Sequence, residues 1–350
     1  MDTTIAPNAA LWIRRWLIII ALMVYAMILI GGATRLTDSG LSITEWDPIS
    51  GTFPPLSEAA WLSEFEKYKQ TAEFRYQNYN MTMGEFQYIY WWEWGHRLFG
   101  RLIGLVAIAG FAIFAANKWL TRRWAIRLAV LIGLGGLQGA IGWWMVASGI
   151  GETSRVDVAP YRLATHFGLA LLIIAITAWF WLDLGGMRAR RVGQTVGHGL
   201  AVILLALISV QMLSGALVAG LDAGRSYTDW PLMQGEFVPS RYIQADLGVR
   251  SLFEGRAATQ FNHRFLAYAL WALSLYAALR HRGSGAGFMV LAGLVTAQAL
   301  WGILTLVSAA PLGLALVHQG LGVIVLLMAV YLTWQTSSAA QFSAPQAAAA

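Results

Sequence analysis

The chain has 350 residues, of which 57% are hydrophobic and only 12% are charged, whereas soluble domains carry about 25% charged residues. Together with a mean hydropathy of +0.56, this composition favours an integral membrane protein. The sequence contains no cysteine, which excludes disulfides, thiolate ligands and cysteine nucleophiles. The net charge of +6 comes from basic residues at the ends of apolar segments, so membrane topology explains it better than nucleic-acid binding does.

Apolar runs of about 20 residues, the length that crosses a bilayer, recur along the chain. They predict an all-α integral membrane protein with eight transmembrane helices, at about 13–33, 88–116, 124–147, 161–183, 196–219, 258–280, 286–307 and 313–335. Between the first two runs we expect some further helix around 57–78. The tail from 337 to 350, which closes in four alanines, is typical of disorder.

Basic and acidic residues fall in alternate connections between the predicted helices. Lysine and arginine gather near 118–127, 188–191 and 280–282, whereas most aspartates and glutamates lie within 38–85 and 222–254. The positive-inside rule therefore predicts cytoplasmic N- and C-termini, with two long outer loops at about 34–87 and 220–257. The first apolar run is too long for a cleaved signal and no transit peptide precedes it, so a bacterial inner membrane is the simplest location.

The two halves of the sequence repeat each other. Residues 40–55 parallel 224–239, residues 138–142 parallel 298–302, and residues 165–168 parallel 317–320. The repeat predicts two pseudo-symmetric four-helix bundles, 1–190 and 191–336, both entered from the cytoplasm and related by an axis along the membrane normal.

Four of the six histidines occupy repeat-related positions near the outer ends of predicted helices: His96, His166, His263 and His318. Two imidazoles facing each other inside a bundle are typical of a six-coordinate haem iron. A closed zinc site would need further ligands in each half, although Glu93 could supply one in the first. The alternative is that these are hydrogen-bonded core histidines. We interpret the other two, His198 and His281, as solvated or interfacial.

The halves differ at one position beside these histidines. Glu93 lies three residues before His96, whereas Gln260 lies three before His263. A carboxylate beside a haem can act as a base, orient water or stabilise positive charge, and a glutamine cannot do proton chemistry. This difference predicts that the first half carries out a reaction while the second holds a haem that transfers electrons. The alternative is that Glu93 pairs with a nearby arginine and only supports the fold.

An arginine directly follows the histidine in each half. Arg97 and Arg264 are candidate partners for haem propionates, because a guanidinium pairs with a carboxylate through two hydrogen bonds. The alternative is that both snorkel to the outer headgroups. Arg101 is a weaker candidate, since its repeat counterpart is Tyr268.

These motifs together resemble the haem A synthase family. The similarity is carried by residues 31–42, the Glu-Trp-Gly-His-Arg segment at 93–97, residues 220–233 and the segment that begins at His318. The resemblance implies an eight-helix membrane enzyme of cytochrome oxidase biogenesis that oxidises the C8 methyl group of haem O to the formyl group of haem A.

The resemblance also implies roles for individual residues. A haem b cofactor in the second half would take His263 and His318 as axial ligands, and the substrate haem would take His96 and His166, with Glu93 as the essential carboxylate. Haem O synthase is an implied partner. Some members carry a cysteine pair in the first outer loop. This chain has none, so it resembles the cysteine-free class shared with the mitochondrial enzymes, and its electron acceptor is left open.

Two rival functions stay open at this point. A diheme b-type electron carrier would explain four histidines but not the difference between Glu93 and Gln260, and its haems should be spaced across the membrane. A transporter built from parallel repeats would have no reason to place imidazole pairs at one depth.

Overall fold

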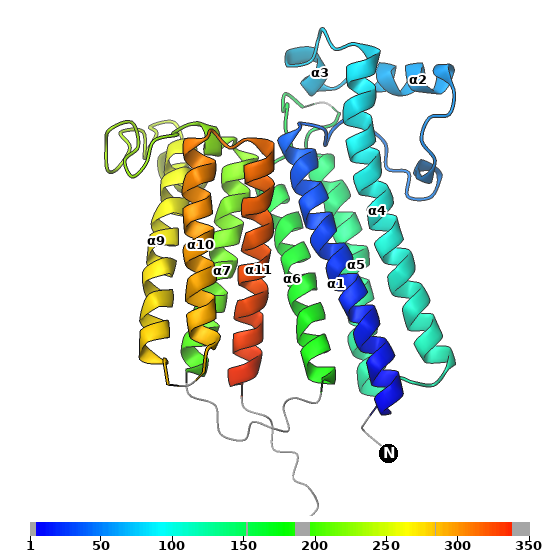
Figure 1. Cartoon of the computed structure of the whole chain (residues 1–350). Coiled ribbons are helices and arrows are strands. Elements are labelled where there is room, and N and C mark those ends of the chain that lie inside the picture. Colours follow the sequence, from blue (N-terminus) through cyan, green and yellow to red (C-terminus); the bar gives the residue numbers. More distant parts are fainter. Residues whose placement is uncertain (1–4, 152, 186–196, 284, 338–350) are drawn as a thin grey trace, which may run out of the picture.

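The computed structural model describes residues 5–151, 153–185, 197–283 and 285–337. Within these ranges it contains no β-strand, and Met233 and Glu236 form an isolated bridge. The long helices run side by side (Figure 1) and are α1 (Pro7–Leu36), α4 (Met83–Ala116), α5 (Arg122–Val146), α6 (Pro160–Leu184), α7 (His198–Gly220), α9 (Arg256–Arg280), α10 (Gly287–Val307) and α11 (Leu312–Thr336). The shorter helices are α2 (Glu58–Tyr68), α3 (Ala72–Tyr76) and α8 (Ser251–Glu254), with 3₁₀ turns at Ser50–Thr52, Ala223–Arg225 and Gly248–Arg250.

Each of the eight predicted runs coincides with one long helix, within a few residues at either end. Seven of these helices, all except α9, are long and apolar enough to cross a membrane, so the described part of the chain is that of a multi-pass membrane protein. Helix α9 is long enough to cross a membrane, but Gln260, Asn262 and Arg264 make its first turns polar. The predicted boundary between 190 and 191 and the tail from 338 lie outside the described residues.

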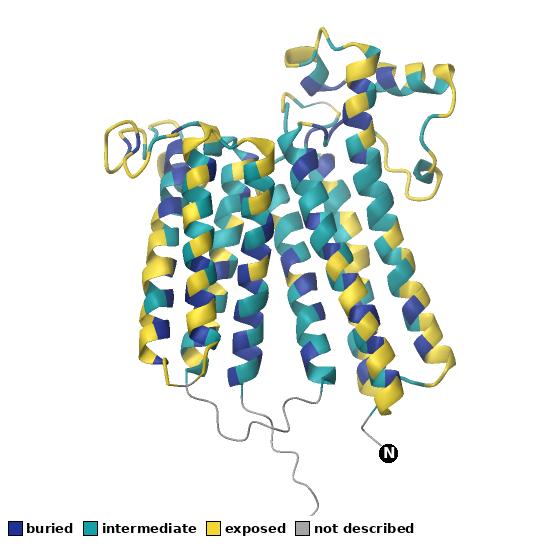
Figure 2. Ribbon diagram, viewed as in Figure 1, coloured by how far each residue is buried: buried dark blue, intermediate teal, exposed yellow. Residues whose placement is uncertain are grey.

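Large aliphatic side chains face outward along the long helices. Leu105 is 64% exposed, Leu300 63% and Ile113 55%, and exposed positions recur down the length of the helices (Figure 2). A helix that is hydrophobic on its outer as well as its inner face is stable in lipid rather than in water. These surfaces therefore fit the hydrocarbon region of a bilayer.

The helices pack in two groups of four. Helices α4 and α6 each pack against α1 and α5, and helices α9 and α11 each pack against α7 and α10. Between the groups, α6 contacts α7 and α11, and α1 contacts α11. Fully buried aliphatic side chains such as Leu17, Leu128, Ile174, Leu204 and Val323 form one continuous core through both groups.

A charged cluster joins the two groups at their outer ends. The guanidinium of Arg35, at the end of α1, lies 2.8 Å from Asp38, 2.9 Å from Asp222 and 3.4 Å from Asp157. Asp222 follows α7 and Asp157 precedes α6, so this single cation ties together three separate connections. Arg35 is nearly buried, with 12% of its side chain exposed, and a buried cation of this kind is stable only when it is paired.

The first outer loop folds into a small cap on α4. Helix α4 has 34 residues and is about 51 Å long, so its first turns extend beyond the other helices (Figure 1). Phe65 and Tyr68 of α2 pack there against Phe86, Ile89 and Tyr90 of α4. The additional helix expected around 57–78 is therefore confirmed, as α2 and α3.

A buried carboxyl group lies within this cap. Glu73 of α3 is 2% exposed and accepts a hydrogen bond of 3.0 Å from the hydroxyl of Tyr68. Burial raises the pKa of Glu73 to about 8, although the hydrogen bond from Tyr68 acts in the opposite direction.

We expect the cap to lose stability as the pH rises. Because the pKa of folded Glu73 lies above the ordinary value of 4.5, the stabilisation from its protonated form is complete below that value and is lost as the pH rises through about 8. Limited proteolysis of 57–78 should therefore become faster for the wild-type protein than for Glu73→Gln over this range. A rate ratio that does not change with pH would contradict the expectation.

Candidate functional site

The four predicted ligand histidines come from four different helices. His96 lies on α4, His166 on α6, His263 on α9 and His318 on α11. Since α4 and α6 both pack against α1 and α5, they stand on opposite sides of the first group, and α9 and α11 are arranged in the same way in the second. His96 and His166 thus lie on opposed helices of the first group, and His263 and His318 on opposed helices of the second. All four side chains are only partly buried, and their pairing around a haem stays a prediction.

Each imidazole lies against a glycine of a neighbouring helix. A methyl group added at Gly31 would lie 3.2 Å from Nε2 of His96, and one at Gly215 would lie 3.1 Å from Cε1 of His263. At Gly142 and Gly302 the corresponding distances to Cε1 of His166 and His318 are 2.9 and 2.7 Å. A Cβ atom at any of these positions would push the ring away, so the glycines form cradles for the four rings.

The carboxylate of Glu93 is buried, 2% exposed, and held by four donors. Oε2 accepts hydrogen bonds of 2.8 Å from the hydroxyl of Ser42 and from the backbone N–H of Ile43. Oε1 accepts from Nε and Nη2 of Arg97, at 3.1 and 2.6 Å. Arg97 also donates to the carbonyl oxygens of Ile43 and Glu45, so the outer loop, the carboxylate and the guanidinium form one fixed unit.

The second half repeats this unit without the carboxylate. Arg264 donates to the carbonyl oxygens of Tyr227 and Asp229, the repeat counterparts of Ile43 and Glu45, at 3.0 and 2.9 Å. Gln260, in place of Glu93, donates to the carbonyl of Tyr227 at 3.0 Å. The hydrogen-bonding pattern of the arginine is therefore shared, whereas the acid is confined to the first half.

These contacts bear on the roles predicted for the charged residues. Glu93 does pair with a neighbouring arginine, which is the contact that the alternative role of Glu93 requires. Arg97 and Arg264 both donate to loop carbonyls, and Nε of Arg264 is buried with no hydrogen-bond partner in the described part of the chain. Their assignment to haem propionates stays a prediction. Arg101 likewise donates to the carbonyls of Asp47 and Pro48.

The two remaining histidines differ from each other. His198, at the start of α7, lies with Nδ1 3.1 Å from the hydroxyl of Thr336 and is partly buried. His281 is 8% exposed and stacks on Phe288 with ring centroids 4.7 Å apart. His281 is therefore not solvated, because Phe288 of α10 packs onto the turn that follows α9, and the interfacial half of the interpretation stays a prediction.

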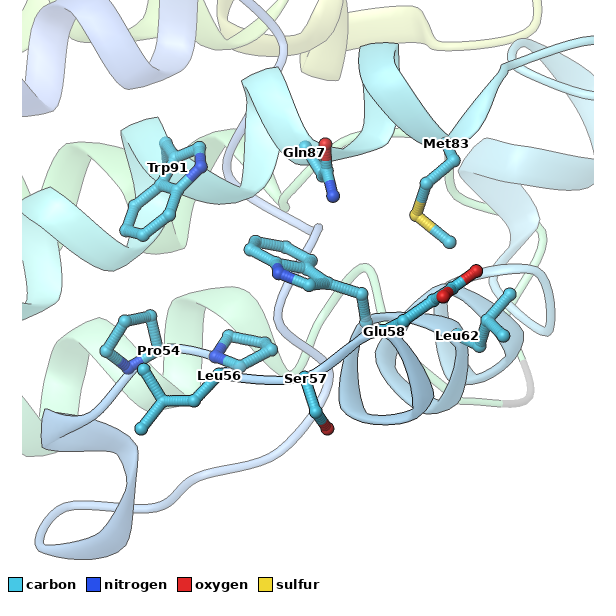
Figure 3. A pocket seen from close by; sticks show the side chains of 10 residues that line it. Pro54, Leu56, Ser57, Glu58, Leu62, Met83, Gln87 and Trp91 are labelled. Atoms are coloured by element: carbon cyan, nitrogen blue, oxygen red, sulfur yellow. The ribbon is translucent and has the colours of Figure 1, made fainter.

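Two clefts open between the outer loop and α4. The larger, about 640 Å³, lies between the segment from Pro54 to Leu62 and the side chains of Met83, Gln87 and Trp91 (Figure 3). The smaller, about 260 Å³, is lined by Arg97 and Arg101. Neither cleft is lined by any of the histidines. Within the described ranges no three His, Asp or Glu side chains converge as they would around a bare metal ion.

Some residues of this site were not singled out by sequence reasoning. Ser42 contacts Glu93 from 51 residues away, and each of the four cradle glycines, Gly31, Gly142, Gly215 and Gly302, faces a histidine of another helix. The repeat-related spacing of each glycine to a histidine on another helix was the signal that could have identified them.

The fold and the site define a class of protein: a multi-pass helical membrane protein with four histidines that lie against glycines of neighbouring helices, and one buried carboxylate a turn before the first of them. The family model COX15-CtaA, described as cytochrome oxidase assembly protein, matches residues 14–330. The chain belongs to this family.

Curated relatives cover most of the chain. It is 66% identical over 336 residues to a protein of Hyphomonas neptunium named Heme A synthase, with 95% of each chain covered. Proteins of the same name from Paracoccus denitrificans and Maricaulis maris are 49% and 47% identical. These matches cover 88% and 92% of this chain, and 83% and 95% of the relatives. The resemblance inferred from the motifs is therefore confirmed at the level of the family.

A glycine substitution tests the cradles. We expect Gly302→Ala to destabilise the protein by about 1–3 kcal/mol, because the added methyl group would lie 2.7 Å from His318. Gly293→Ala on the same helix is the matched control, since nothing lies within 4 Å of its added methyl group. Thermal unfolding in detergent measures both, and equal melting temperatures for the two variants would contradict the cradle.

Proposed function

We propose that this protein is a haem A synthase, an oxidoreductase that converts the C8 methyl group of haem O to a formyl group for cytochrome oxidase. The family match and the relatives named Heme A synthase support this function. The observation that carries it is the position of Glu93, a single buried acid inserted into a hydrogen-bonding unit that otherwise repeats in both halves. A diheme electron carrier would leave that difference without a purpose.

We propose eight spans arranged as two pseudo-symmetric bundles, 1–190 and 191–336, with α9 as the eighth span. Helix α9 packs between α7 and α10 just as α4 packs between α1 and α5. The polar groups of Gln260 and Arg264 donate to loop carbonyls instead of facing lipid. Polar residues of a spanning helix are tolerated when they are satisfied within the protein.

The histidine pairs fit haem iron. Each pair offers two neutral nitrogen donors from opposite sides of one helix group, and buried Nδ1 of His318 has no partner among the described residues. We assign His263 and His318 to a resident haem b, and His96 and His166 to the substrate haem. The resident haem supplies one-electron redox chemistry when bound.

Glu93 lies on the helix that carries His96, one turn away from it. Its four donors fix the orientation of the carboxylate, and only 2% of the residue is exposed to solvent. Once an electron acceptor has removed two electrons, and a base one proton, from the methyl group, a carboxylate held in this way can take a proton from the water that attacks the resulting carbon, or stabilise positive charge at the porphyrin edge. Gln260 cannot take a proton from water, and because it is neutral it stabilises positive charge poorly.

We place the protein in a bacterial inner membrane, and the charge distribution supports cytoplasmic termini with the outer loops on the opposite side. Lys118, Arg122 and Arg280 lie at the ends of the long helices away from the cap, whereas Asp38, Glu73 and Asp222 lie at the cap end. Haem O is the proposed substrate and haem O synthase, which supplies it, a proposed partner.

Glu93→Gln tests the proposed chemistry. We expect the variant to retain haem and to lose haem A formation by about 100-fold or more, since general acid–base catalysis contributes on that scale. Haem extraction and mass analysis after co-expression with a haem O source measure both quantities. Glu73→Gln is the matched control, because it makes the same change at an equally buried glutamate in the cap.

Two outcomes would contradict the role of Glu93. Normal haem A formation by Glu93→Gln would remove the carboxylate from the mechanism. Loss of all bound haem from this variant, with Glu73→Gln intact, would show that Glu93 supports the structure rather than the reaction.

A further inference from the structure

Three of the four histidine cradles contain the same pair of residues. A glutamine lies four residues, or one helical turn, before the cradle glycine in Gln138–Gly142, Gln211–Gly215 and Gln298–Gly302. Residues four apart share one face of a helix, so the amide and the glycine both face the histidine. At the corresponding position of α1, four residues before Gly31, the chain has Met27.

Each glutamine binds the backbone of the histidine it faces. The side-chain amides of Gln138, Gln211 and Gln298 donate to the carbonyl oxygens of His166, His263 and His318, at 3.0, 3.1 and 2.9 Å. Nε2 of Gln211 also lies 3.2 and 3.3 Å from the two ring nitrogens of His263. Because it is nearly equidistant from both nitrogens, it lies over the ring rather than in line with either one.

The oxygen of each glutamine side chain, Oε1, is buried and makes no hydrogen bond in the described part of the chain. A histidine that binds iron through Nε2 carries a proton on Nδ1, and such a histidine nearly always donates this proton to a neighbouring oxygen. Among the described residues none of these glutamine oxygens lies within hydrogen-bonding distance of a ring nitrogen, so the glutamines hold the histidines through the backbone carbonyls. The hydroxyl of Ser214, 3.3 Å from Nδ1 of His263, is an acceptor for that ring.

His96 has no counterpart of the glutamine Gln211 or of the serine Ser214 on the helix that it faces. The thioether of Met27 cannot donate to the carbonyl of His96 and is a weak acceptor, and Ile30 stands where Ser214 stands in the second half. Cε of Met27 lies instead 3.1 Å from the position of a Cβ on Gly100. Within the described residues no side-chain hydrogen bond reaches the imidazole of His96.

We infer that Met27 is a positioning residue that leaves His96 a weakly held, exchangeable ligand, whereas Gln211 and Ser214 hold His263 as a permanent one. The inference rests on the proposed function, in which the first half must release its porphyrin after each reaction and the second half keeps its own. Positions 27 and 211 then decide which half exchanges.

Haem release tests this directly, with haem b as the probe in both halves. Detergent-purified protein is loaded with haem b and mixed with excess apomyoglobin, and transfer is followed by absorbance. We expect two phases, and His96→Ala should remove the faster one. Met27→Gln should slow the fast phase, and Gln211→Met should accelerate the slow phase, each about tenfold or more, because loss of such a partner typically costs 10–100-fold in metal affinity. Met23→Gln, the same change one turn away on α1, should leave both rates unchanged.

A redox titration provides a second readout. A ligand imidazole that donates from Nδ1 is a stronger base and favours ferric iron. Ser214→Ala should therefore raise the midpoint potential of the second-half haem, because it removes the oxygen nearest Nδ1 of His263.

The outcomes separate the inference from the proposed function. Purified protein that takes up no haem b would overturn both. If the protein binds two haems but the release rates of Met27→Gln and Gln211→Met differ from those of the wild type by less than twofold, the inference is overturned and the proposed function is not. If Met27→Gln does not fold, Gln211→Met and Ser214→Ala decide the matter, and the absence of faster release in both would refute it.

Discussion

Inside a membrane protein a polar group must find its partners within the protein, because the lipid offers none. In this chain the partners of the central polar side chains come from the outer loops. Arg97 and Arg264 each donate to two backbone carbonyls at repeat-equivalent positions. Each arginine directly follows a histidine, so the interaction that satisfies the guanidinium also fixes the height and rotation of the neighbouring imidazole. The site depends on this clamp between loop and helix.

A duplicated framework allows one copy to change. The arginine clamp, the glycine cradles and the helix arrangement are common to both halves. The differences gather around His96, where Glu93 replaces a glutamine and Met27 replaces another. Both changes alter what a bound porphyrin would meet without altering the backbone that holds it. This pattern is expected if the first half modifies and releases its haem while the second half keeps its haem bound.

Much of the fold could be predicted from sequence, because the bilayer restricts the solutions. A spanning segment must be helical and about 20 residues long, so apolar runs locate the helices within a few residues. The polar first turns of α9 weaken this signal, since the partners that satisfy Gln260 and Arg264 are more than 30 residues distant in sequence. The repeat identified the four histidines, because a single interior histidine has many explanations and four equivalent ones have few.

The sequence by itself determined the helical membrane fold, the repeat, the four histidines and the unmatched acid Glu93, because each is recorded in local composition or periodicity. Only the tertiary structure decided what these groups touch. In it, Arg97 binds the loop carbonyls and Glu93, and His281 stacks on Phe288. A glutamine binds the backbone of three of the histidines, whereas the equivalent position on α1 is Met27. Such contacts join residues on different helices and loops, and their directions follow from how the helices pack, which local sequence does not specify.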